Sequence, residues 1–91
     1  MKKITNFSDL KEGQKYSLYS KQFNATNEAI LITKNFITGL NRDIVYFQFT
    51  RSIEKPITKE RFIYQMKHNH MVFDTFAMWY WEFDNYDIYE I

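Results

Sequence analysis

The chain contains no cysteine, and this absence removes three kinds of chemistry at once. A disulfide-stabilised scaffold, a thiol nucleophile and a thiolate metal site are all excluded. Two glycines and one proline among 91 residues argue against a collagenous or low-complexity chain. Aromatic residues make up 20% of the chain, which is more than a disordered segment carries. We therefore expect one folded domain over residues 1–91, stabilised by its core alone.

Long apolar runs are also missing from the sequence. No stretch of 18 apolar residues is present, so no transmembrane helix is expected. The segment Met1–Asp9 begins with two lysines, but the apolar stretch of a secretory signal peptide does not follow them. The sequence therefore predicts a cytoplasmic protein, in the host cytoplasm if it is viral.

Basic side chains are absent from the last quarter of the chain. All twelve Lys and Arg residues lie at or before Lys67, together with six acids, whereas the chain from His68 onward holds five acids and no base. The two parts carry +6 and −5, although the net charge is only +1. Either the two parts neutralise each other within the fold, or the acidic end belongs to an interaction surface.

Alternating β-forming residues predict an antiparallel arrangement of strands. Three strands are expected first, at residues 15–19, 29–33 and 43–50, with a polar loop over 20–28. Turn residues between the second and third strands predict a hairpin. In the third strand, the face that carries Val45, Phe47 and Phe49 is the better candidate for the core.

Residues 58–68 carry the local signals of a helix. Thr58 is a suitable N-cap, because its hydroxyl can accept a hydrogen bond from an amide two or three residues further on. Ile57 and Phe62 have the spacing of a hydrophobic staple. This helix is the best-defined element that the sequence predicts.

The closing stretch, residues 75–91, is ambiguous. Residues 75–83 fit either a strand or a helix, and the strand is favoured because aromatic side chains lose rotamer freedom in helices and pack well on pleated sheets. Asp84 and Asn85 are expected to turn the chain, and residues 88–91 to form a short terminal strand or tail.

Together these elements predict an α+β fold. We expect a small antiparallel sheet, or a partly open SH3-like barrel, of about five strands with one helix around residues 58–68. The order of elements resembles that of small SH3-like or Tudor-like barrels. No sequence motif supports this resemblance, so it assigns no role to any residue.

Motifs for catalysis and metal binding are missing from the sequence. There is no GxSxG, no phosphate-binding loop, no HExxH and no calcium loop. His68, His70 and Asp74 could approach a metal ion, but they match no zinc spacing, and a histidine at a helix end also interacts favourably with the helix dipole. Glu60 and Arg61 with His68 are the weak candidates for a small hydrolase. No catalytic residue, cofactor or metal is predicted.

The aromatic and acidic residues near the end of the chain suggest a protein interface. Tyr and Trp dominate interface hot spots, and carboxylates beside them would complement a basic partner. One arrangement buries the whole stretch as a central strand; another places Trp79 and Trp81 inside and residues 86–91 outside. The predicted interface residues are Trp79, Tyr80, Glu82, Asp84, Tyr86, Asp87, Tyr89 and Glu90.

Basic residues interspersed with aromatic ones suggest an alternative partner, RNA or a single-stranded nucleic acid in a ribonucleoprotein complex. Cations would follow the phosphates while rings stack on bases. A net charge of +1 is far below that of a committed nucleic-acid binder, so this hypothesis ranks second. Its candidate residues are Lys34, Arg42, Arg51, Lys55, Lys59, Arg61 and Lys67.

The sequence therefore predicts a small non-catalytic binding protein with a protein partner and no membrane partner. A homo-oligomer is compatible with the sequence. The short chain, the missing cysteines and the usage rich in Lys, Asn, Ile and Phe are typical of small accessory proteins of bacteriophages. Such proteins commonly inhibit a host or defence protein, and we expect this mode of action here.

Overall fold

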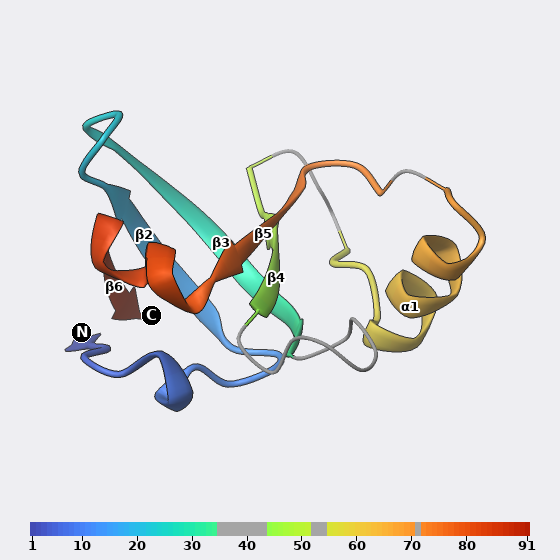
Figure 1. Ribbon diagram of the computed structural model, residues 1–91, viewed down its shortest axis with the longest axis horizontal. Helices are drawn as coiled ribbons and strands as arrows, with labels where there is room; N and C mark the ends of the chain where they lie inside the picture. The colour runs from blue at the N-terminus through green and yellow to red at the C-terminus, as the bar shows by residue number, and fades with distance from the viewer. Residues whose placement is uncertain (35–43, 52–54, 71) are drawn as a thin grey trace.

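Six strands form one antiparallel sheet in the computed structural model, which describes residues 1–34, 44–51, 55–70 and 72–91 (Figure 1). The strand order is β1-β6-β2-β3-β4-β5, so β1 and β5 are the two edges. The sheet does not close into a barrel. The strands are β1 (Lys2–Lys3), β2 (Lys15–Ser20), β3 (Ala25–Lys34), β4 (Ile44–Phe49), β5 (Thr75–Trp79) and β6 (Tyr86–Glu90).

These elements confirm the α+β class predicted from the sequence. The short N-terminal strand β1 was not predicted, and it raises the number of strands from about five to six. The polar loop expected over 20–28 is shorter than predicted, because β3 already begins at Ala25 and its residues 25–30 pair with the whole of β2. Asn24 adopts a left-handed conformation with φ 51°, which is suited to the tight turn between these two strands.

One α-helix and two short 3-10 helices complete the described elements. The helix α1 (Lys59–Lys67) lies beside one end of the sheet, away from the two chain ends (Figure 1). The 3-10 helices are η1 (Phe7–Asp9) and η2 (Tyr80–Asn85). As predicted, the Thr58 hydroxyl accepts from the Arg61 amide at 3.2 Å. Among the described residues, no helix has the length and apolar character needed to cross a membrane.

The larger hydrophobic cluster covers the inner face of the curved sheet. It draws on every strand except β1, and on the segment that leads into β2. Phe47 is completely buried, and its ring lies against those of Tyr16 and Phe76, with centroids 6.2 and 5.3 Å away. The members of this inner cluster are Ile4, Leu10, Tyr16, Leu18, Ala29, Leu31, Val45, Phe47, Met78 and Ile88.

A second cluster fills the space between α1 and the opposite face of the sheet. Ile44 and Tyr46 of β4 contribute to it, and the rings of Tyr46 and Phe62 are 5.1 Å apart. The sequence indicated one core face for β4, but both faces are buried, because α1 covers the second one. The members of this helix-side cluster are Ile32, Ile44, Tyr46, Phe62 and Val72, with Ile57 and Trp79 packed against them.

The ambiguous segment 75–83 is divided between two elements. The strand β5 ends at Trp79, and the 3-10 helix η2 follows directly. The expectation that Trp81 lies inside is wrong, since 61% of its surface is exposed. The expectation that residues 86–91 lie outside is also wrong for β6, which pairs with β1 on one side and β2 on the other and buries Ile88.

A partly exposed hydrogen-bond network around Glu12 attaches the N-terminal segment to β3 and α1. One carboxylate oxygen of Glu12 accepts from the Lys34 amide at 2.8 Å and from the Thr33 hydroxyl at 3.0 Å. The other accepts from the Lys59 ammonium at 2.9 Å. Burial alone would raise the pKa of Glu12, but the hydrogen bonds from Lys34, Lys59 and Thr33 outweigh it and hold the pKa below its usual value. The folded state therefore favours the charged carboxylate.

Acidification should release this network before it affects the hydrophobic core. Folding lowers the pKa of Glu12, so the Glu12 carboxylate stabilises the folded state fully above its unfolded-state pKa of about 4.3. This stabilisation is lost as the pH falls through the folded-state pKa. We expect Glu12→Gln to lower the free energy of unfolding by about 1 kcal/mol at pH 7 and by much less at pH 3. Urea unfolding at both pH values measures this difference. Asp9→Asn, at an exposed carboxylate of η1, serves as the control, and an equal deficit at both pH values would contradict the assignment.

Candidate protein interface

The half-buried Trp79 and the exposed Tyr80 and Trp81 form an aromatic group where β5 meets η2. The rings of Trp79 and Trp81 stack with centroids 4.7 Å apart and planes inclined by 12°. Tyr80 meets Trp81 edge to face at 5.6 Å. Trp81 is 61% exposed and Tyr80 is 53% exposed. We call these three residues the aromatic ridge.

The ridge is held in place from within the fold. The Glu82 carboxylate accepts from the Trp79 amide at 3.0 Å, which fixes the change of direction from β5 to η2. Phe7 of η1 packs edge to face against Tyr80 and against Phe83, with centroid distances of 6.5 and 5.9 Å. A partner that binds the ridge would therefore order few side chains, and the entropy cost of association would be small.

The ridge continues into β5, which pairs with β4 and with no other strand among the described residues. Natural edge strands usually carry charges or proline, which discourage pairing with another chain. The sequence of β5, Thr-Phe-Ala-Met-Trp, contains neither. Ala77 is exposed in its middle, so little side-chain bulk covers this part of the strand. An extended segment of a partner could therefore add to the sheet beside the ridge.

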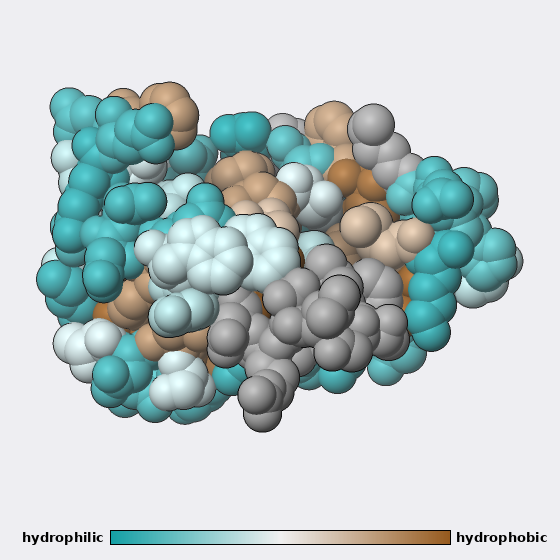
Figure 2. All heavy atoms as spheres, in the orientation of Figure 1, coloured by the Kyte–Doolittle hydropathy of each residue, from teal (hydrophilic) through white to brown (hydrophobic). Residues whose placement is uncertain are grey.

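Figure 2 shows the surroundings of this edge on one face of the molecule. Hydrophilic residues occupy both ends of the face, while residues of intermediate and apolar hydropathy are exposed in its middle, over the region of β4 and β5. A centre that is less hydrophilic than its border is the usual anatomy of a protein interface.

The eight predicted interface residues are divided equally between two neighbouring parts of the chain. Trp79, Tyr80, Glu82 and Asp84 lie in β5 and η2, whereas the rest lie in β6. Along β6 the side chains alternate between faces. Burial, and to a lesser degree the charge of Glu82, raise the pKa of Tyr86, which packs against the inner cluster. By this alternation Glu90 shares the face of Tyr86, whereas Asp87 and Tyr89 lie on the opposite face.

Trp81 is the ridge residue that sequence reasoning did not include in the interface. The residues that follow it, Glu82 to Asn85, could have indicated its exposure. Their polar side chains are typical of a turn and cannot continue a strand that is buried on both faces. A tryptophan at the start of such a turn is exposed more readily than one in the middle of a strand.

Part of the acidic end is neutralised within the fold. Asp87 lies 3.3 Å from the Lys3 ammonium and 3.7 Å from that of Lys21, and Asp74 lies 3.2 Å from the Arg51 guanidinium. Within the described ranges, Glu82, Asp84 and Glu90 form no ion pair. The excess negative charge available to a partner therefore includes η2, directly beside the ridge.

The candidate nucleic-acid residues are distributed over several elements. The Lys34 ammonium donates to the Leu10 and Ser8 carbonyls at 2.7 and 3.2 Å. Lys59 pairs with Glu12, and Arg51 is engaged by Asp74. Lys55, Arg61 and Lys67 are exposed in the segment before α1 and on α1 itself; Arg42 lies outside the described residues.

The histidine pair lies at the end of α1. The Nδ1 atom of His68 is 2.8 Å from the Tyr64 carbonyl, and its ring stacks on that of Tyr64 at 4.2 Å. The rings of His68 and His70 are 6.4 Å apart. In the part of the chain that the structure describes, no group of three or more His, Cys, Asp or Glu side chains is placed to hold a metal ion.

The chain matches no protein-family model, no curated protein and no solved structure. A function therefore has to be inferred from the geometry of the ridge and its surroundings.

Proposed function

We propose that this chain is a non-catalytic binding protein that docks another protein through the aromatic ridge. The observation that carries the proposal is the exposure of Trp81 and Tyr80 in a stacked and internally supported arrangement. Exposed large aromatic side chains are unfavourable in water unless another surface covers them. Trp and Tyr also supply much of the binding energy at protein interfaces.

The partner surface that best complements the ridge is basic. Glu82 and Asp84 place carboxylates in η2, next to the tryptophans. An Arg or Lys of the partner could lie over the face of Trp81 and, at the same time, approach these carboxylates. In the part of the chain that the structure describes, β5 pairs on one side only, so its other side offers backbone donors and acceptors to an extended segment of the same partner.

The mode of action that this surface supports is inhibition of the partner protein by covering one of its functional surfaces. A small protein with a rigid hydrophobic anchor can cover a functional surface of a host or defence protein without any chemistry of its own. This mode agrees with the prediction, drawn from the length and composition of the chain, that it inhibits a host or defence protein.

Replacement of Trp81 by Ala tests the proposal. We expect the variant to lose at least about 30-fold in affinity for the captured protein, since truncation of a hot-spot residue costs ~2 kcal/mol or more. Its melting temperature should change little, because 61% of the Trp81 surface is exposed. The measurement is a pull-down with the wild-type chain, identification of the captured protein, and titration of the purified pair.

Tyr64→Ala is the matched control, because Tyr64 is 59% exposed on α1. It should retain full affinity. Wild-type affinity of the Trp81 variant would show that the ridge is not the interface. A partner that is captured only without nuclease treatment would point to the alternative, in which the chain binds a nucleic acid.

A further inference from the structure

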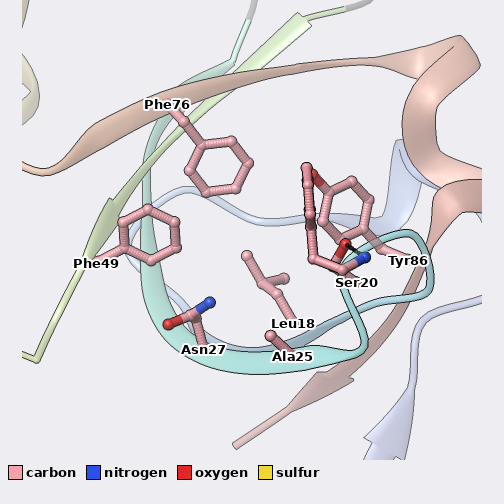
Figure 3. Close-up of a pocket in the computed structure, with 8 residues that line it drawn as sticks. Leu18, Ser20, Ala25, Asn27, Phe49, Phe76 and Tyr86 are labelled. Atoms are coloured by element: carbon pink, nitrogen blue, oxygen red, sulfur yellow. Dashed lines mark hydrogen bonds between the residues drawn. The ribbon is translucent and has the colours of Figure 1, made fainter.

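A cavity of about 350 Å³ opens on the inner face of the sheet, between the β2–β3 hairpin and the inner sides of β4, β5 and β6. Figure 3 shows the rings of Phe49, Phe76 and Tyr86 arranged around this space, with the side chain of Leu18 pointing into it. The residues that line it are Leu18, Ser20, Phe23, Ala25, Asn27, Phe49, Phe76 and Tyr86. A volume at the low end of the range for ligand sites suits a compound of one or two rings.

Aromatic rings supply most of the cavity wall. Phe49 and Phe76 stack with centroids 4.9 Å apart, and Phe76 and Tyr86 are 6.4 Å apart with planes inclined by 31°. The Arg51 guanidinium lies 4.7 Å from the centroid of the Phe49 ring, so this wall has a cationic neighbour. A planar ring in the cavity could meet these rings in offset or edge-to-face contacts, which aromatic pairs prefer.

The rim of the cavity carries an exposed phenylalanine. Phe23, at the tip of the β2–β3 hairpin, is 73% exposed. Its amide donates to the Ser20 hydroxyl at 3.2 Å, and the Tyr19 hydroxyl donates to Asn24 at 2.5 Å, so the turn that carries Phe23 is fixed on both sides. A bound ring would remove part of the Phe23 surface from water, which favours binding.

The side-chain amide of Asn27 faces the cavity with a defined orientation. The Asn27 side-chain oxygen accepts from the Arg51 guanidinium at 3.2 Å, so its amide nitrogen is directed the other way. Figure 3 shows this nitrogen on the side of the cavity. Within the described residues, no hydrogen bond is formed by this nitrogen. An oxygen on a bound ring could accept a hydrogen bond from it.

We propose that this cavity binds a small planar aromatic ring that carries one hydrogen-bond acceptor, such as a phenol. The site is separate from the aromatic ridge, because Phe76 faces the inner side of β5 while Trp79 faces the other side. The proposal does not depend on the proposed function, and the failure of either leaves the other untouched.

An NMR titration of the full chain with p-cresol tests the site. We expect saturable shifts of the Leu18 and Ala25 methyl signals, with a Kd on the order of 1 mM or tighter, as befits a ligand of this size. Cyclohexanol has the same hydroxyl group without an aromatic ring, and it should bind at least about 5-fold more weakly, since it loses the ring-to-ring contacts. The natural ligand could be a tyrosine side chain of a protein or a free phenolic compound, and N-acetyl-tyrosinamide distinguishes the two. If it binds as tightly as p-cresol, the ligand is a protein side chain; if it binds more weakly, the ligand is a free compound.

Two variants test whether p-cresol binds in this cavity. Ala25→Leu fills the space from an exposed position and should abolish p-cresol binding without lowering the melting temperature. Phe23→Ala should weaken binding several-fold, whereas Phe73→Ala, at a similarly exposed ring outside the cavity, should not. The proposal is overturned if p-cresol causes no saturable shift up to ~10 mM, if cyclohexanol binds equally well, or if Ala25→Leu retains the wild-type affinity.

Discussion

Replacement of Phe47 by Ala is expected to lower the free energy of unfolding by about 3–5 kcal/mol, the cost of truncating a fully buried phenylalanine. Phe47 has no exposed surface, and its ring contacts those of Tyr16 and Phe76 on the inner face of the sheet. In a domain whose total stability is about 5–15 kcal/mol, this loss leaves a substantial unfolded fraction. The melting temperature should fall by more than ~12 °C.

Urea or thermal unfolding followed by circular dichroism measures this loss. Phe73→Ala is the control, because Phe73 is 68% exposed and its truncation should change the free energy of unfolding by less than about 0.5 kcal/mol. Similar losses for the two variants would mean that the inner cluster does not carry the stability of the domain.

The second large effect is expected in β6. Ile88→Asp places a carboxylate in the inner cluster opposite Leu18, where Ile88 is 1% exposed. An unpaired buried charge is among the few changes that destabilise by about 4 kcal/mol or more. We therefore expect Ile88→Asp to unfold the domain, and the near-ultraviolet circular dichroism of its many aromatic side chains should collapse.

Tyr89→Asp adds the same charge one position further along the strand. Alternation directs this side chain to the opposite face, where residue 89 pairs with Lys3 of β1 and with Ser17 of β2. This variant should remain folded. If both variants fold, residues 86–90 do not form an inner strand, and the alternative in which residues 86–91 lie outside the core is favoured.

Local signals in the sequence predicted the parts of the fold that local interactions determine. The helix around 58–68 depends on the Thr58 cap and on residues within one turn of it, and it was found at Lys59–Lys67. The strand at β4 was similarly evident from its β-forming residues. Its second buried face was not evident, because that burial is provided by α1, which lies later in the chain.

The end of the chain was harder to predict because its structure depends on distant segments. Residues 86–90 are too short and too polar to identify as an inner strand without knowledge of β1 and β2, which supply both pairing partners. The aromatic density of residues 75–83 indicated a strand throughout, but the Glu82 carboxylate binds the Trp79 amide and ends the strand there. As a result, the interface residues predicted from the sequence include two members of the aromatic ridge but omit Trp81, its most exposed residue.

The insertion of β6 between β1 and β2 constrains the order in which the sheet can be built. Until residues 86–90 have been synthesised, β2 has no partner on that side, although β3 and β4 can already pair. Contacts between such distant segments slow folding, because a long loop must close before they contribute any stability. During this interval the nascent chain would present the edge of β2 and the apolar side chains of Tyr16 and Leu18 to other proteins. The sheet is therefore complete only when β6 has paired with both β1 and β2, and folding intermediates that lack this strand expose an unpaired edge of β2 that favours aggregation.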